Sequence, residues 1–223
     1  MAEQHAKQSA VEETAKRIEV LTHSSIRITG ENIIYIDPFH VEQEFHDADY
    51  ILITHEHYDH FSMEDIEKVL SPQTILVMPE TMRAQADGIS GHEILFITPG
   101  GRLSLDGLTL KAAAAYNLDK PFHPKENGWV GYILEIDGVR IFIAGDTDMT
   151  PDNRTVSCDV ALLPIGGKYT TDAAQAAEFA NVLRPRIVIP THYGSVAGGK
   201  ENEAVFAAGV DSQIRVEIKM QKY

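Results

Sequence analysis

The stretch ILITHEHYDH at residues 51–60 carries the clearest chemical signal in the sequence. The apolar run 51–53 leads directly into His55, His57, Asp59 and His60. Imidazole nitrogens and carboxylate oxygens are natural ligands of divalent Zn, Mn, Fe or Co. Extended backbone would point the first two rings to one side, and a turn after them would direct Asp59 and His60 toward a second cation. The stretch therefore predicts a metal site at the end of a buried strand, rather than a solvated loop that is rich in histidine.

Two further residues of ligand type also follow apolar strands. Asp146 ends the run IAGD at 143–146, and His192 ends the run IVIPTH at 187–192. Gly145 permits close approach of the backbone, and a carboxylate placed there could bridge two cations. Either residue alone is typical of an ordinary turn or of a hydrogen-bonded structural histidine. Their positions relative to residues 51–60 favour a shared site.

A weak internal repeat relates the two halves of the chain. Four landmarks recur in the same order at offsets of 109 to 112 positions, and the pairs are 35–37 with 143–146, 49–53 with 159–163, helix 62–70 with helix 171–183, and 75–79 with 187–190. Any single pair would carry no weight, but the shared order indicates two related halves packed face to face. We therefore expect an α/β fold of the α+β kind, a four-layer αββα sandwich from two pseudo-repeated halves, whose strand-end loops converge at one edge.

Short apolar runs separated by helical segments support this mixed architecture. The predicted strands cover 26–28, 33–36, 50–54, 74–78, 94–97, 108–115, 131–136, 139–144, 160–163, 186–189 and 214–219. The predicted helices cover 62–70, 80–86, 171–183 and 201–208. Residues 1–17 are expected to form a flexible N-terminal tail or a short surface helix, and residues 18–223 a single domain.

Composition narrows the class of protein. The chain has 223 residues, 43% of them hydrophobic, with 19 basic and 33 acidic side chains and a formal charge of −14. This charge disfavours nucleic acid and anionic membranes as partners. The single cysteine, Cys158, cannot form an intramolecular disulfide and is expected to be a small core side chain. No stretch is long and apolar enough for a membrane span and the first residues are polar, so a cytoplasmic protein is expected.

The motif His-x-His-x-Asp-His at residues 55–60 resembles the signature of the metallo-β-lactamase-fold hydrolase superfamily. The resemblance extends from about residue 18 to the C-terminus. Four further segments are most similar to the branch that includes ascorbate-6-phosphate lactonase, which is itself similar to the N-acyl phosphatidylethanolamine phospholipase D group. These segments are THSS at 22–25, IDPF at 36–39, AGDT at 144–147 and LPIGG at 163–167.

The resemblance implies a set of metal ligands. The first metal would be held by His55 and His57, the second by Asp59, His60 and His192, and both by Asp146 as a bridge. The resemblance also implies that Asp37 supports the ligands without binding metal itself.

One departure from the family pattern concerns the first metal. The family supplies another histidine from the end of the strand before the second half, but here that strand ends in 114–117, with the sequence AAYN. His123 lies six residues after Asn117 and could be brought back by the intervening loop. The alternatives are that His123 is a surface loop residue, and that water, Tyr116 or Asn117 completes the first site.

The resemblance implies a metal-dependent hydrolase that uses two divalent ions. Zn is the first expectation, and Mn, Fe, Co or Ni also suit mixed nitrogen and oxygen ligands. A hydroxide bound to both metals would cleave an ester, lactone or phosphodiester in a small anionic substrate, with Asp59 orienting the nucleophile or taking its proton. His23 is expected near the site as an acid or substrate contact, and Lys168 is expected to hold a carboxylate or phosphate.

Two other functions remain open at this stage. The chain could be a catalytically degenerate metal-binding regulatory or scaffold protein, because the strand-end histidine is missing. A nuclease ranks lower, because the additional domain usual for such enzymes is absent and the net charge is unfavourable. Oligomerisation is left open.

Overall fold

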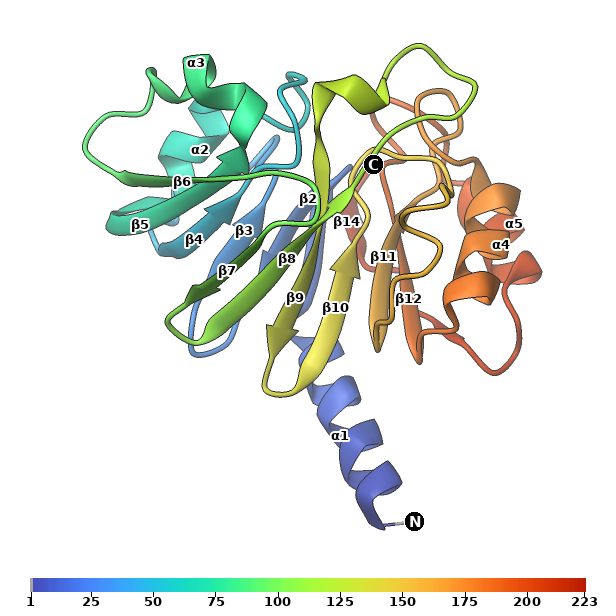
Figure 1. Cartoon of the computed structure of the whole chain (residues 1–223). Coiled ribbons are helices and arrows are strands. Elements are labelled where there is room, and N and C mark those ends of the chain that lie inside the picture. The colour runs from blue at the N-terminus through green and yellow to red at the C-terminus, as the bar shows by residue number, and fades with distance from the viewer. Residues whose placement is uncertain (1) are drawn as a thin grey trace.

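Apolar, β-branched runs build two seven-stranded sheets in the computed structural model, which describes residues 2–223 (Figure 1). The first sheet has the order β14 (Met220–Lys222), β1 (Ile18–Thr22), β2 (Ser25–Ile28), β3 (Ile34–Ile36), β4 (Ala48–Leu52), β5 (Leu70–Pro79) and β6 (Glu93–Ile97). The second has the order β13 (Arg215–Val216), β12 (Ile187–Thr191), β11 (Val160–Pro164), β10 (Val139–Ile143), β9 (Val130–Ile136), β8 (Leu108–Ala114) and β7 (Arg102–Leu105). One hydrophobic core contains buried side chains from both sheets.

Helices cover the outer faces of both sheets. On the first sheet, α2 (Met63–Val69) and α3 (Arg83–Ala86), the latter preceded by the 3-10 turn η1 (Glu80–Met82), bury Ile66 and Met82 against β4 and β5 in a second hydrophobic cluster. On the second sheet, α4 (Ala173–Leu183) packs on β11, and α5 (Asn202–Gly209) packs on α4. A short turn, η2 (Lys125–Asn127), precedes β9. The predicted αββα layering is confirmed (Figure 1).

The two halves repeat the same pairing pattern. Strands β1 to β6 pair in order, first as two antiparallel pairs and then as three parallel pairs. Strands β8 to β13 pair in the same order and with the same directions. The repeat predicted from the four landmarks is therefore present in the strand topology.

The N-terminal segment forms helix α1 (Ala2–Lys16), so of the two expectations for it the structure has the helix. The side chains of Val11 and Ala15 are fully buried in the main core. Lys7 Nζ lies 2.8 Å from Asp159 Oδ2 at the start of β11. The opposite end of α1 extends away from the body of the molecule (Figure 1). The helix thus packs against both sheets, at β1 and β10.

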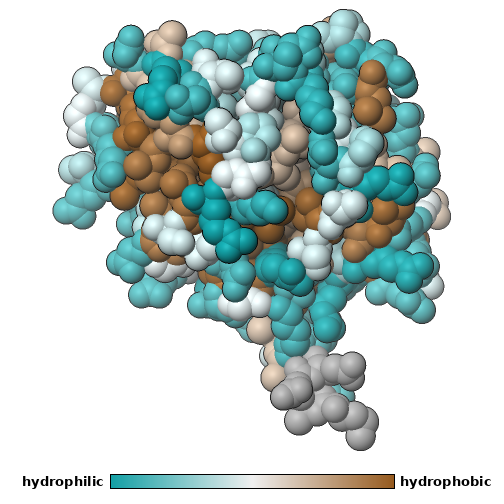
Figure 2. All heavy atoms as spheres, in the orientation of Figure 1, coloured by the Kyte–Doolittle hydropathy of each residue, from teal (hydrophilic) through white to brown (hydrophobic). Residues whose placement is uncertain are grey.

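The molecular surface is mostly polar on the face shown in Figure 2. Hydrophobic side chains gather on it over β6 and α3, where Ile94 and Phe96 are half-buried. Arg83 lies across this patch, with its guanidinium carbon 4.1 Å from the centre of the Phe96 ring. Within residues 2–223, no helix has the length and apolar character needed to cross a membrane.

Candidate metal centre

The ligand-type residues meet at one edge of the sandwich because the strands that precede them end there. The chain leaves β4 shortly before His55, leaves β10 shortly before Asp146, and leaves β12 directly before His192. Strand β4 runs parallel to β3 in the first sheet, and β10 and β12 both run parallel to β11 in the second, so the carboxyl ends of β10 and β12 lie at the same edge of their sheet. His23 lies in the turn between β1 and β2 at the same place.

Three histidines form a first cluster. His55, His57 and His123 each offer a nitrogen within 4.8 Å of the others. His55 Nε2 is 3.1 Å from His57 Nδ1, and the ring centroids of His57 and His123 are 5.0 Å apart. His55 and His123 are buried, while His57 is half-exposed. The half-exposed ring marks the side on which solvent reaches the cluster.

A second cluster lies beside the first. Asp59, His60, His192 and His23 offer one ligand-type atom each within 4.8 Å of one another, and all four are buried. Asp59 Oδ2 is 3.7 Å from His60 Nε2 and 3.9 Å from His192 Nε2. Carboxylate and imidazole donors at such spacing suit a divalent cation.

Asp146 lies between the two clusters. Its Oδ2 is 3.2 Å from His123 Nε2 and 2.8 Å from His192 Nε2. Its Oδ1 is 3.3 Å from His60 Nε2, and His55, His60 and Asp146 form a third group within 4.8 Å. One carboxylate thus contacts a histidine of the first cluster and two of the second.

The residues of this centre fit a metal because several of their buried nitrogen and oxygen atoms make no hydrogen bond. Among the buried atoms of this centre that have no hydrogen-bond partner within the described chain are four that lie close together, namely His60 Nε2, His123 Nε2, His192 Nε2 and Asp146 Oδ1. Leaving buried polar atoms unpaired is costly, and native proteins rarely do so without a ligand. Here the four atoms belong to side chains that face one another. A cation between them would satisfy them together.

Asp37 fixes the orientation of His60. Its carboxylate accepts hydrogen bonds from the Thr54 N–H at 2.8 Å, from the Thr54 hydroxyl at 2.6 Å, and from His60 Nδ1 at 2.7 Å. His60 therefore presents Nε2 to the cluster, as metal-binding histidines usually do when a carboxylate holds the other nitrogen. Burial opposes protonation of His60, but Asp146 and Asp37 raise its pKa well above the usual value. A cation would take the place of that proton.

His23 plays the same part for Asp59. Its Nε2 lies 3.1 Å from Asp59 Oδ2, and its ring lies 3.9 Å from that of His192 between centroids. Burial, followed by the neighbouring His192, lowers the pKa of His23 to about 4. Burial alone would raise the pKa of Asp59, yet the hydrogen bond from His23 and the nearby His60 lower it to about 2. At neutral pH a neutral His23 thus donates to an ionised Asp59.

His123 reaches the cluster because Asn117 closes the loop that carries it. The Asn117 N–H donates to the His123 carbonyl at 2.8 Å, and the His123 N–H donates to Asn117 Oδ1 at 3.1 Å. The same Oδ1 lies 3.1 Å from His123 Nδ1, which leaves Nε2 to face Asp146. The side chain is only 1% exposed, so it is not a surface loop histidine. Tyr116 is directed elsewhere, since its hydroxyl donates to Asp152 Oδ2.

The structure does not bring Lys168 into either cluster. Its side chain is exposed, with Nζ 4.8 Å from the centre of the Tyr169 ring. Sequence reasoning missed two neighbours of the ligands, Trp129 and Thr54. The Trp129 ring lies 5.0 Å from His55 and 4.9 Å from His57, and Thr54 Oγ1 lies 3.0 Å from His55 Nδ1. The only indication in the sequence that Thr54 lies beside the ligands is its position directly before His55. No feature of the sequence around Trp129 indicates that it lies there.

Comparisons with known proteins agree with the fold and identify the family. A family model described as the β-lactamase superfamily domain matches residues 17–192. A UPF0173 metal-dependent hydrolase of Methanosphaera stadtmanae is 34% identical over 221 residues, which cover 89% of this chain and 92% of the relative. A UPF0173 metal-dependent hydrolase of Pyrococcus abyssi is 31% identical and covers 80% and 85% of the two chains.

Solved structures show the same architecture. One from Parabacteroides distasonis, described as a metal-dependent hydrolase, superposes with a TM-score of 0.78 at 30% identity and covers 92% and 93% of the two chains. Igni18, a metallo hydrolase of Ignicoccus hospitalis, has a TM-score of 0.74 at 23% identity, covers 92% and 95%, and shares the fold. The chain therefore belongs to the β-lactamase superfamily and, within it, to the UPF0173 metal-dependent hydrolases. The finer resemblance to the ascorbate-6-phosphate lactonase branch stays a prediction.

Proposed function

We propose that this hydrolase binds two divalent cations and cleaves an ester, lactone or phosphodiester bond in a small anionic substrate. The observation that carries the proposal is the position of Asp146, whose carboxylate contacts His123 on one side and His60 and His192 on the other. A single carboxylate shared between two groups of histidines is the arrangement that two neighbouring cations require.

Each cation has its own donors in this proposal. His55, His57 and His123 would hold one, Asp59, His60 and His192 the other, and Asp146 both. When bound, such cations supply Lewis acidity and make water nucleophilic near neutral pH. Zn suits these ligands best, and Mn, Fe, Co or Ni also suit them.

Asp59 and His23 would position the attacking water and take up its proton. The contacts of Asp59 with His23, His60 and His192 all involve Oδ2. We assign Oδ1, which makes none of these contacts, to orient the attacking water and to accept its proton. His23 keeps the carboxylate in place through its hydrogen bond to Oδ2.

We assign Lys168 to bind the negatively charged group of the substrate. Its ammonium is exposed and forms no ion pair within 4 Å in the part of the chain that the structure describes. The Tyr169 carbonyl accepts a hydrogen bond from Asn117, so this unpaired lysine lies one residue from a contact of the loop that carries His123 and would attract a carboxylate or phosphate. The alternative of a degenerate binding protein was argued from the missing strand-end histidine, and the proposal instead assigns that ligand to His123, whose Nε2 lies 3.2 Å from Asp146 Oδ2.

The test is hydrolysis of p-nitrophenyl esters and bis(p-nitrophenyl) phosphate by protein loaded with Zn or Mn. We expect activity that a chelator abolishes and that Asp59→Ala lowers at least about 100-fold, because the variant loses both a ligand and the proton acceptor. His46→Ala, which changes an exposed histidine, is the control and keeps the native rate. Equal activity in Asp59→Ala and the native protein would mean a contaminating enzyme and would contradict the proposal.

A further inference from the structure

Large exposed apolar side chains lie in the loops that carry residues of the metal centre. Tyr58 is 68% exposed, Leu118 54% and Phe122 38%, and the half-buried Tyr169 joins them. We call these four side chains the apolar rim. Of the other large exposed hydrophobic side chains of the described chain, Val182 lies on α4, Val205 lies on α5, Ile218 precedes β14, and Tyr223 packs against Tyr193. Scattered apolar residues need no explanation, but a group beside a reactive centre indicates a binding surface.

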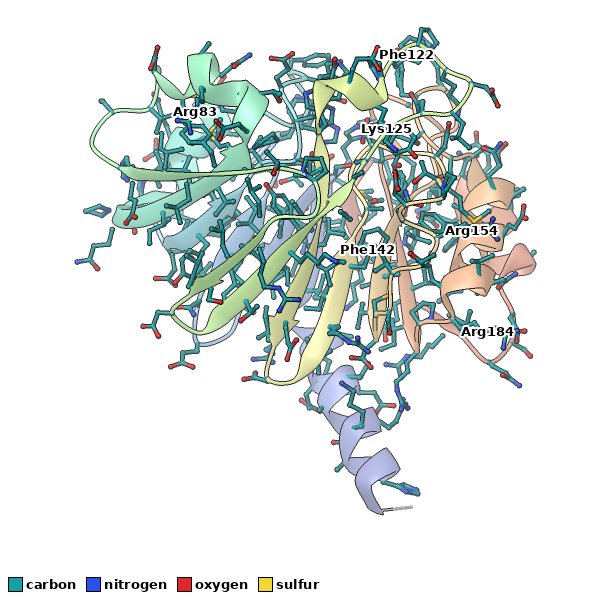
Figure 3. The ribbon with its side chains drawn as sticks, viewed as in Figure 1. Arg83, Phe122, Lys125, Phe142, Arg154 and Arg184 are labelled. Atoms are coloured by element: carbon teal, nitrogen blue, oxygen red, sulfur yellow. The ribbon has the colours of Figure 1, made fainter. Side chains whose placement is uncertain are left out.

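Chain connectivity places the rim at the centre. Tyr58 directly follows His57, and Phe122 directly precedes His123. The rings of these two histidines are 5.0 Å apart between centroids, and each has an exposed aromatic residue next to it in the chain. Figure 3 shows Phe122 at the edge of the molecule where the strand-end loops gather. The segments that carry the first cluster therefore also carry exposed apolar side chains.

Hydrogen bonds hold the rim in this position. The loop 117–123 is closed by the Asn117 and His123 pair, and Leu118 and Phe122 lie just inside its two ends. The Leu118 N–H donates to Asp148 Oδ2 at 2.9 Å. The Phe122 ring packs edge-on against Tyr169 with 4.7 Å between centroids, and the Tyr169 carbonyl accepts from Asn117 Nδ2 at 2.9 Å. One ordered loop thus presents both a ligand-type histidine and two exposed apolar side chains.

A ligand that covers this apolar surface would remove it from water, and this burial would contribute favourably to the free energy of binding. We propose that the substrate carries an aliphatic or aromatic group that packs on the apolar rim, while the bond to be cleaved lies at the metal centre. This inference rests on the proposed function and narrows its substrate class from a small anion to an amphiphilic one. Lys168, 4.8 Å from the Tyr169 ring, places the negative group of such a substrate next to its apolar group. A membrane is the less favoured occupant, because the molecule carries a formal charge of −14.

The experiment measures binding, so that it does not depend on the bond cleaved. Calorimetry follows the affinity of the Zn-loaded protein for n-alkylphosphonates of two to eight carbons, kept below their micelle concentrations. We expect Kd to fall about threefold for each added methylene, as partial burial of a CH₂ group predicts. Leu118→Ala and Phe122→Ala should reduce that factor to less than about 1.5-fold, while metal content stays unchanged. Val182→Ala on α4, with a side chain as exposed as that of Phe122, should behave as the native protein.

Each outcome decides one question. A Kd that does not depend on chain length, or a chain-length effect that survives both rim variants, overturns the inference. Rim variants that change sedimentation with anionic vesicles but not phosphonate affinity would mean that a membrane surface is the occupant, and would also overturn it. A rim-dependent chain-length effect in a protein that hydrolyses none of the esters refutes the proposed function instead.

Discussion

At the scale of single residues, the centre depends on pairs in which one side chain orients another. Asp37 holds His60, His23 holds Asp59, and Asn117 holds His123. Asp37 and Asn117 each occupy one nitrogen of a histidine and leave the other nitrogen facing the cluster, whereas His23 holds the Asp59 carboxylate through Oδ2. Since a metal-binding histidine presents only one nitrogen at a time, these partners decide which nitrogen is available.

The histidine at position 23 makes stability depend on pH. Its pKa is about 4 in the folded protein, against an ordinary value of 6.5, so between these values the unfolded chain binds a proton that the folded chain does not. Stability of the chelator-treated protein should therefore fall as pH drops from about 6.5 to about 4, by about 3 kcal/mol from this residue alone. Urea unfolding across that range should show a shallower pH dependence in His23→Asn, a side chain that tolerates the left-handed backbone at φ 51°. An unchanged pH dependence in the variant would contradict the assignment.

Most of the centre could be predicted from spacing and strand ends. His55, His57, Asp59 and His60 come from one short stretch, and the structure places them where that stretch implied. The position of His123 could not be decided, because it depends on hydrogen bonds between residues six apart in an irregular loop. Lys168 was expected to hold a carboxylate or phosphate, its ammonium lies 4.8 Å from the centre of the Tyr169 ring, and that role stays a prediction.

At the scale of secondary structure, strands were predicted where their apolar pattern is local. The strands missing from the prediction are β1, β7 and β14. Strand β7 is only half-buried or exposed along its length, and β14 is a three-residue segment that pairs with β1 about 200 positions away. Such strands form because a partner is already present, so their own sequence gives little indication of them.

The close approach of β9 and β10 requires glycine at position 131. A Cβ there would lie 2.4 Å from the Ala144 carbonyl oxygen and 2.5 Å from that of Ile143. Gly131→Ala should therefore lower the free energy of unfolding by about 1–3 kcal/mol and weaken Zn binding, because the displaced backbone leads directly to Asp146. Gly88→Ala is the matched control, since its Cβ would meet only the Gln85 carbonyl oxygen at 3.5 Å. Urea midpoints and Zn affinity that are equal in the two variants would show that the strands do not position Asp146.

At the scale of the whole molecule, the metal centre lies where the two sheets are joined. The Tyr132 hydroxyl of the second sheet donates to the Ile53 carbonyl of the first at 2.6 Å, and the Val130 N–H donates to the Thr54 carbonyl at 3.2 Å. The His192 N–H donates to the His23 carbonyl at 2.8 Å. The repeat in the sequence predicted the two halves, but these bonds between them could only be seen in the structure.

The measurement that tests this account most directly is metal content per chain. The protein is purified without chelator, saturated with Zn and freed of excess metal, and its Zn content is then measured by elemental analysis. His123→Ala and the control His46→Ala, which changes an exposed residue, are treated in the same way. We predict about two Zn in the native protein and in His46→Ala, and about one in His123→Ala, because the variant loses the third histidine of the first cluster. One Zn or none in the native protein, or two retained by His123→Ala, would contradict the dinuclear centre with His123 as a ligand.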